Sequence, residues 1–337
     1  MQLHLLVWVG SSAVTASPGA VISSIGGSST NRTLAVDDPN FGKVNRTFVL
    51  HVPPKLSAAP SLVVGFHGQS GVAWSWALGH SYDSFSDRDG WVVVYPQGVA
   101  DVDDKGRYDS GWNVGTNGDN STCLPGTTGT ACHVSCRRRR LCGRCAWSHC
   151  YDDVAFISQL LSALSVEFPS IDKSRMYAVG ESNGGMLVHH LAQSLTGVFA
   201  AVVPVFALPL LGYMVGGQYE LVQRIGLARQ TSVLQLHDRS DVTIPWRGGN
   251  SSDGWLYESL NRTLGTWAAL HGCELAPREV PTHLDPPSRM RCYVHQGCTA
   301  GSAVSHCMYD GSHGDWPKQP AADRIIWAFF RNRTLGV

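Results

Sequence analysis

The sequence lacks a surplus of charge of either sign. Lys and Arg together number 26 of its 337 residues, and Asp and Glu together also number 26. Proteins that bind a nucleic-acid backbone, an anionic membrane or a polyanionic substrate usually carry an excess of basic residues. The balance argues against these partners, and we expect a neutral substrate and no nucleic acid.

A long hydrophobic run is also missing. No stretch approaches the roughly 20 apolar residues that a membrane-spanning helix needs, so we expect no stable membrane anchor. The short apolar run that begins the chain is followed by Val14-Thr15-Ala16, and this pattern predicts a signal peptide over residues 1–16 and a secreted protein. A disordered N-terminus is the alternative, because basic residues do not precede the run. The Ser-, Gly- and Thr-rich stretch that follows predicts a flexible leader over residues 17–40.

Cysteine, by contrast, is abundant, with ten residues in two even groups. Cys142 and Cys145 form a Cys-x-x-Cys pair that would supply half of a zinc site, but no second such pair is present. We therefore expect disulfides rather than a metal, with the pairing left open. The groups are Cys123, Cys132, Cys136, Cys142, Cys145 and Cys150, then Cys273, Cys292, Cys298 and Cys307.

Six Asn-x-Ser/Thr triplets also favour export, because this sequence is the acceptor for N-linked glycans. The predicted glycosylation sites are Asn31, Asn45, Asn120, Asn250, Asn261 and Asn332.

Short β-branched or aliphatic runs alternate with segments of helical spacing, which predicts a mostly parallel sheet covered by helices on both faces. We expect one catalytic domain over residues 41–337 and see no internal repeat. The predicted strands are 46–52, 61–66, 91–95, 175–179, 200–205, 232–236 and 304–309, and the predicted helices are 152–168, 185–195, 256–270 and 321–330.

Residues 99–150 break this rhythm, being rich in Gly, Asn, Asp and Cys, and predict a disulfide-tied surface insertion. The insertion contains Arg137-Arg138-Arg139-Arg140, which is a processing site, an anion patch or simply a solvated loop.

The best candidate for chemistry is Ser182, in Gly180-Glu181-Ser182-Asn183-Gly184. In so glycine-rich a chain the motif alone is close to chance, but an apolar strand runs straight into it and a helix follows. A serine on such a tight strand-to-helix turn is exposed as a nucleophile. The peptide N–H of Asn183 would then face a developing oxyanion.

A second oxyanion donor is expected from the turn after an early strand, and the N–H of Gln69 is our candidate. His67 in the same turn precedes the nucleophile, so we expect it to support the turn rather than act as the base.

Two aspartates compete for the triad acid, because Asp238 ends a strand and Asp241 lies in the loop beyond it. His313, in a glycine-flanked loop after a strand, is the favoured base. The other histidines after Asp241 are His271, His283, His295 and His306. The order Ser, Asp, His is that of the α/β-hydrolases, and this chemistry needs no metal or organic cofactor.

The chain resembles the secreted α/β-hydrolase esterases that include feruloyl esterases and poly(3-hydroxybutyrate) depolymerases. The matching segments are Gly65-Phe66-His67-Gly68, residues 91–98, Gly111-Trp112-Asn113, residues 152–156, residues 180–186 and residues 199–201. The resemblance implies an α/β-hydrolase fold and assigns the acid to Asp241, in a loop that reads Asp-x-x-hydrophobic-Pro-aromatic. It also implies a base just before a Trp-Pro pair, which is His313. The segment Leu208–Gln230 is longer than the family pattern leads us to expect, and we interpret it as a lid or as a wall of the acyl pocket.

Together these features predict a serine carboxylic-ester hydrolase that acts on plant cell-wall esters, as feruloyl esterases do. Its substrate would be an ester linked to a polysaccharide or part of a polyester. Poly(3-hydroxybutyrate) depolymerase and acetylxylan esterase activities are the alternatives. A serine peptidase would need a further domain, and a non-catalytic binding module would be expected to have lost triad residues.

Overall fold

The apolar runs of the sequence form the strands of one large sheet. The computed structural model describes residues 27–103, 105–114, 133–140, 149–211, 231–252, 254–280, 290–318 and 321–336. Several predictions lie outside these residues: the signal peptide, Asn120, four cysteines of the first group (Cys123, Cys132, Cys142 and Cys145), His283 and most of Leu208–Gln230.

Within the described residues, ten strands form this sheet in the order β1-β2-β4-β3-β7-β8-β9-β14-β13-β12. Their bounds are β1 Ser28–Asp38, β2 Gly42–Val52, β3 Leu62–Phe66, β4 Val92–Pro96, β7 Met176–Glu181, β8 Ala201–Val205, β9 Ser232–Asp238, β12 Arg278–Val280, β13 Arg291–His295 and β14 Val304–Tyr309. Two short pairs stand apart from the sheet, β5 Val99–Val102 with β6 Tyr108–Gly111 and β10 Gly249–Asn250 with β11 Leu256–Tyr257.

The six central strands, from β4 to β14, run parallel, and the outer pairs on both sides are antiparallel. Both faces of the central strands are buried, so their residues alternate between two cores instead of between core and solvent. In β3, for example, Leu62 and Val64 belong to one core and Val63 to the other.

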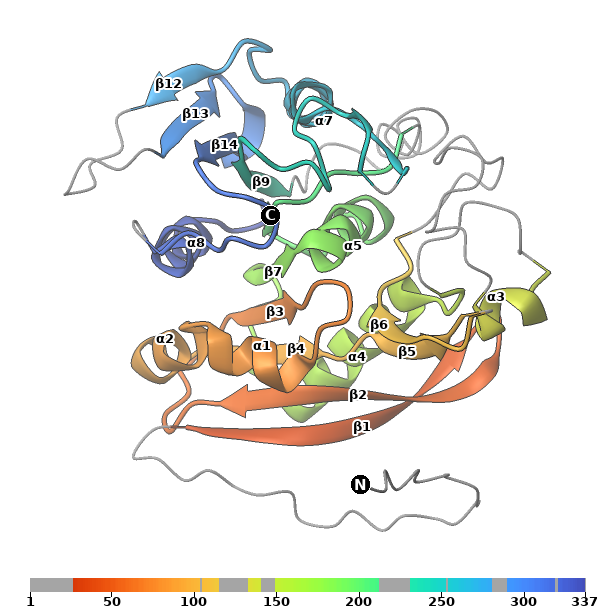
Figure 1. Ribbon diagram of the computed structural model, residues 1–337. Coiled ribbons are helices and arrows are strands. Elements are labelled where there is room, and N and C mark those ends of the chain that lie inside the picture. The colour runs from red at the N-terminus through yellow and green to blue at the C-terminus, as the bar shows by residue number, and fades with distance from the viewer. Residues whose placement is uncertain are drawn as a thin grey trace.

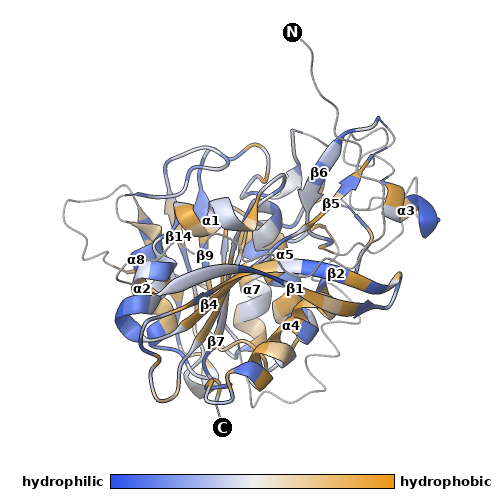
Figure 2. Cartoon of the chain, turned by 90° about the horizontal axis from the view of Figure 1, so that it is seen from below, coloured by the Kyte–Doolittle hydropathy of each residue, from blue (hydrophilic) through white to orange (hydrophobic). Residues whose placement is uncertain are grey.

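Helices cover both faces, as Figure 1 shows. Helices α4 Asp153–Glu167, α5 Ser182–Ser194 and α7 Leu260–Leu270 contribute to one core, and α1 Ala73–Gly79, α2 Tyr82–Asp89 and α8 Ala322–Arg331 to the other. Strand β4, one of the central strands, is mostly hydrophobic, while α2 is mostly hydrophilic (Figure 2). Among the described residues, no helix has the length and apolarity that crossing a membrane requires.

Several boundaries differ from the sequence prediction, and two of them have a clear physical cause. Residues 28–38, placed in the flexible leader, form strand β1, which pairs with β2 along all eleven of its residues. The leader prediction was wrong there because the stretch is polar, and pairing with a neighbouring strand overrides local composition. Helix α7 begins at Leu260 instead of Leu256, since Ser259 caps its first turn by accepting the N–H of Arg262.

The predicted insertion contains the β5–β6 hairpin and helix α3 Val134–Arg138. A disulfide between Cys136 and Cys150 ties α3 to the chain that enters α4. All four residues of Arg137–Arg140 are exposed at the end of α3. In the second cysteine group, Cys273 pairs with Cys298 and Cys292 with Cys307.

Candidate active site

Three parallel strands of the central sheet, β7, β9 and β14, bring the predicted catalytic residues to one edge of the sheet. Ser182 follows β7, Asp241 lies just beyond β9, and His313 lies in the loop after β14. The carboxyl ends of parallel strands meet at the same edge, which is where α/β sheets place their ligands.

Ser182 occupies a sharp turn between β7 and α5. Its φ of 49° is rarely adopted by a residue with a side chain. The neighbouring glycines permit the turn, because a Cβ on Gly180 would lie 2.6 Å from the carbonyl oxygen of Gly184. A Cβ on Gly184 would lie 2.3 Å from the carbonyl oxygen of His67. The turn therefore requires small residues on both sides and leaves the serine hydroxyl at the edge of the sheet.

The three side chains form a continuous hydrogen-bonded line. Ser182 Oγ lies 2.8 Å from His313 Nε2, and His313 Nδ1 lies 2.8 Å from Asp241 Oδ2. A carboxylate can only accept, so Nδ1 carries the proton and Nε2 is the acceptor for the serine hydroxyl. The other oxygen of Asp241 accepts the N–H groups of Thr243 and Ile244 at 2.9 and 2.7 Å, which fixes the carboxylate toward the imidazole.

The competing acid, Asp238, does not join this line. Its carboxylate is buried, and its Oδ1 accepts the N–H of Ser240 at 3.1 Å. Burial, reinforced by the nearby charge of Asp241, raises the pKa of Asp238 to about 6. Among the described residues, the carboxylate that is bonded to His313 is that of Asp241, so Asp241 is the one placed to orient the imidazole.

The competing histidines lie elsewhere in the fold. His306 is a buried residue of β14, stacked on Tyr293 at 4.8 Å between ring centres. His271 follows α7, and His295 ends β13. The structure therefore brings only His313, among the histidines that it describes after Asp241, to the serine.

His67 supports the turn that follows β3. Its Nε2 accepts the N–H of Gly98 at 3.0 Å, so Nδ1 carries the proton and donates to the carbonyl of Gly68 at 2.7 Å. Burial lowers the pKa of His67 to about 4, which keeps the ring neutral at ordinary pH. Both ring nitrogens are engaged in holding backbone, as a structural role requires.

The predicted oxyanion donors flank Ser182. A Cβ on Gly68 would lie 3.3 Å from Ser182 Cβ, so the turn containing Gln69 passes directly over the nucleophile. Asn183 is the second residue of α5, and the first N–H groups of a helix have no partner within the helix. If the carbon of an ester carbonyl were bonded to Ser182 Oγ, the oxygen of that carbonyl would lie between these two segments.

Sequence reasoning missed the residue that holds Asn183. The N–H of Trp112 donates to Asn183 Oδ1 at 2.7 Å, and Asn183 Nδ2 donates back to the Trp112 carbonyl at 3.2 Å. Trp112 also donates its indole N–H to the carbonyl of His67 at 2.8 Å. The Gly-Trp-Asn segment was visible as a motif, but its contact with the nucleophile turn depends on the tertiary fold.

Glu181 was also missed, although it lies inside the nucleophile motif. Burial raises the pKa of its carboxyl group, and its Oε1 accepts the N–H of Gly68 at 3.4 Å. The ring of Phe206 meets the His313 imidazole edge-on at 5.3 Å. Glu181 thus directly precedes Ser182 in the chain, and Phe206 packs against His313.

Comparisons with known proteins agree with this architecture. Feruloyl esterase B of Neurospora crassa is 26% identical over 164 residues, which is 48% of this chain and 44% of that protein. Feruloyl esterase B of Piromyces equi is 23% identical over 258 residues, or 75% of this chain and 39% of that protein. The chain thus spans less than half the length of these curated relatives. No protein-family model matches it.

Among solved structures, acetyl xylan esterase from Aspergillus awamori superposes with a TM-score of 0.58 at 15% identity. The match covers 90% of this chain and 99% of that structure. The fold is that of the α/β-hydrolases.

The described residues also line hollows at the surface. Beside the oxyanion turn lies a groove of about 500 Å³, whose lining includes Ser70, Tyr108 and Asp109. A second hollow of about 490 Å³ lies between α7 and the β13–β14 pair, with Trp246 and Tyr293 in its wall. Neither lining includes the serine or the base among the described residues.

Proposed function

We propose that this chain is a secreted serine carboxylic-ester hydrolase of the feruloyl-esterase kind, which acts on esters of the plant cell wall. The observation that carries the proposal is the line from Ser182 through His313 to Asp241, with 2.8 Å at each step. This arrangement activates a hydroxyl for attack on an acyl carbon.

The reaction proceeds in two halves. The Ser182 oxygen attacks the ester carbonyl while His313 Nε2 takes the hydroxyl proton, and the resulting oxyanion is bound by the N–H groups of Gln69 and Asn183. The tetrahedral intermediate collapses, the alkoxide leaves with the proton from His313, and an acyl-serine remains. Water then attacks the acyl-serine with His313 again as the base, and the carboxylic acid is released. Asp241 stabilises the imidazolium in both halves.

One observation supports the plant cell-wall esters as substrates, and another supports secretion. The curated relatives in Neurospora crassa and Piromyces equi are named feruloyl esterases. The disulfides of the second cysteine group and the Cys136–Cys150 bridge fit an oxidising compartment, where a secreted enzyme matures. Glycosylation at the exposed asparagines of the Asn-x-Ser/Thr triplets belongs to the same proposal.

The test of the activity is hydrolysis of a p-nitrophenyl ester by the wild-type chain and by S182A. The variant should lose at least about 10⁴-fold in kcat because the nucleophile is gone, with an unchanged melting temperature. Turnover that survives the substitution would overturn the assignment of Ser182. Because Ser182 sits at a φ of 49°, circular dichroism of S182A must show a native spectrum for the comparison to count.

The test of the substrate is a panel of methyl ferulate, acetylated xylan and a hydroxybutyrate oligomer. We expect the highest kcat/KM on methyl ferulate. A higher kcat/KM on acetylated xylan or on the hydroxybutyrate oligomer would mean that the natural substrate is an acetylated polysaccharide or a polyester. Cleavage of peptide amides alone would mean that the protein is a peptidase and not an esterase.

A further inference from the structure

The turn that carries Gln69 is strained. Ser70 has a φ of 59°, a conformation that costs roughly 1 kcal/mol or more for a residue with a side chain and persists only where the surroundings impose it. Within the turn, the N–H of Gly71 donates to the carbonyl of Gly68 at 3.1 Å. Contacts from elsewhere must therefore hold it.

Strand β6 supplies several of those contacts, beside the contacts of His67 and Glu181 with Gly68. The N–H of Ser70 donates to the carbonyl of Ser110 at 2.7 Å, and the Ser110 hydroxyl donates to the carbonyl of Gly71 at 2.7 Å. The neighbouring carboxylate of Asp109 accepts the Ser70 hydroxyl on Oδ1 at 2.5 Å and the side-chain amide of Gln69 on Oδ2. Each carboxylate oxygen thus binds one of two consecutive residues in the turn.

The same stretch of chain also reaches the other predicted donor. Three residues after Asp109, the backbone of Trp112 exchanges two hydrogen bonds with the side chain of Asn183. Residues 109–112 therefore contact the residues on both sides of the place where an oxyanion would form.

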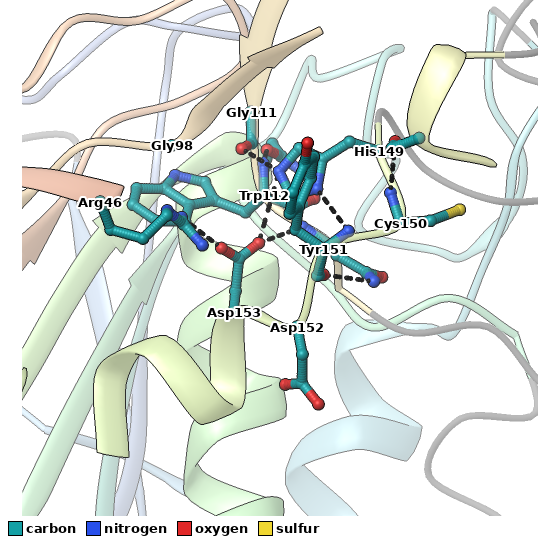
Figure 3. A network of polar contacts seen from close by, with 12 residues as sticks. Arg46, Gly98, Gly111, Trp112, His149, Cys150, Tyr151, Asp152 and Asp153 are labelled. Atoms are coloured by element: carbon teal, nitrogen blue, oxygen red, sulfur yellow. Dashed lines mark hydrogen bonds and ion pairs between the residues drawn. The ribbon is translucent and has the colours of Figure 1, made fainter. Parts of the chain in front are cut away.

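This stretch is itself fixed from below, as Figure 3 shows. The carbonyl of Gly111 accepts the Nε2 proton of His149 at 2.7 Å, and the N–H of Asn113 donates to Asp153 at 2.6 Å. Burial lowers the pKa of His149, which keeps the ring neutral with a single donor. Asp153 pairs with the buried guanidinium of Arg46 at 2.6 Å. The stretch is anchored on the first turn of α4.

We propose that residues 109–112 form a bracket that sets the distance between the two oxyanion donors, and that Asp109 is its positioning residue. This proposal rests on the proposed esterase function. Donors stabilise a transition state only if they are already aimed at the oxygen on which charge develops, so loosening one of them lowers kcat more than it raises KM. A carboxylate suits the position because two donors need an acceptor-only group with two oxygens.

The experiment compares D109N with D101N. Asp101 faces Asp109 across the hairpin in the β5–β6 register, but its carboxylate accepts the N–H of Ser135 in α3 instead of bonding the turn. In D109N the amide nitrogen cannot accept, so one turn contact is lost. The measurements are kcat and KM for a p-nitrophenyl ester, and the inhibition constant of a boronic acid, which forms a tetrahedral anion on an active serine.

We expect kcat of D109N to fall about tenfold to hundredfold, below the 10²–10³ that removal of a whole donor costs, with KM changed less than about threefold. The boronic acid should bind more weakly by a similar factor. D101N should keep kcat within about threefold. If D109N does not fold, S70A removes the Oδ1 contact alone and should give a smaller loss in the same two quantities.

Three results would overturn the bracket: an unchanged kcat in D109N, a reduced kcat with undiminished affinity for the boronic acid, or an equal loss in D101N. If S182A retains full activity, the esterase proposal itself has failed. That outcome is distinguishable because it does not depend on any residue of the bracket.

Discussion

The two halves of the candidate site are built differently. On the oxyanion side, the turn of residues 68–71 and the bracket of residues 109–112 are bonded to each other, to α5 and, through Asp153, to α4. On the base side, His313 projects from the exposed loop of residues 310–316, with one-fifth of its side chain accessible. Gly314 next to it has a φ of +93° and open space around it.

This difference fits the role that the proposed mechanism gives to each half. Oxyanion donors act by being fixed before charge appears, because any reorganisation at that moment would be subtracted from their effect. A general base has to exchange a proton with the nucleophile, the leaving group and water in turn, so its ring needs only the orientation given by Asp241. We therefore expect perturbations of the oxyanion side to affect both stability and rate, and those of the base loop to be better tolerated unless they reach Asp241.

The largest effect is expected where the base side depends on one bond. In D241N the amide would favour the wrong imidazole tautomer, and kcat should fall about 10⁴-fold while the fold is retained. Steady-state kinetics and a thermal melt measure the two quantities. A loss below tenfold would mean that Asp238 or another group orients the imidazole in place of Asp241.

The next effect tests the anchor of the oxyanion side. Arg46 and Arg32 each approach a carboxylate at 2.6 Å, but the Arg46–Asp153 pair is buried and the Arg32–Glu167 pair is substantially exposed. R46M should lower the free energy of unfolding by about 3–5 kcal/mol, because it leaves a buried charge uncompensated. R32M is the matched control and should cost less than about 1 kcal/mol. If denaturant titrations showed equal losses of unfolding free energy in R46M and R32M, the buried Arg46–Asp153 pair would not be what anchors the oxyanion side.

A smaller effect concerns Asp238, the buried carboxylate next to the site, and the pH dependence of the free energy of unfolding. Its pKa is raised from 3.8 to about 6 in the folded chain, so the folded state binds this proton more tightly than the unfolded state does. The resulting penalty is absent below about pH 4, grows between pH 4 and 6, and is complete above pH 6, with a size on the order of 3 kcal/mol.

The variant D238N lacks this titration. Its stability relative to the wild type should rise by that amount between pH 4 and pH 7, measured as the difference of the two unfolding free energies at each pH. A difference that stays flat across this range would show that Asp238 does not titrate as described.

The smallest effect is expected in the base loop. An alanine at Gly314 meets no neighbour within 4 Å but is strained at its positive φ, so G314A should cost about 1 kcal/mol. We expect kcat to change by less than about tenfold, since an exposed loop can relax. A larger kcat loss at unchanged stability would show that the base side is as rigid as the oxyanion side.

Local pattern accounts for what could be predicted from the sequence. The buried strands and Ser182 were identified because an apolar run, a glycine-rich turn and a helix follow one another along the chain. Asp241 could not be chosen over Asp238 by spacing, since Asp238 ends β9 and Asp241 lies only three residues further on. The resemblance to the esterase family favoured Asp241, and in the structure the hydrogen bond to His313 comes from Asp241.

The remaining features depend on contacts between distant segments. Strand β1 is polar and becomes a strand only by pairing with β2. The links from Asp109 to Ser70 and from Trp112 to Asn183 join residues 39 and 71 positions apart. No periodicity in the sequence marks such contacts. The Gly-Trp-Asn motif could therefore be seen in the sequence, but the bracket to which it belongs could not.

The most direct test of the central claim is to label the protein with a fluorophosphonate and to locate the adduct by peptide mass spectrometry. An activated serine reacts through the same attack and the same oxyanion contacts as an ester. We predict one adduct, on the peptide that contains Ser182, and none in D241N on the same time scale. An adduct on another residue, or ester hydrolysis that continues after complete labelling of Ser182, would contradict the account.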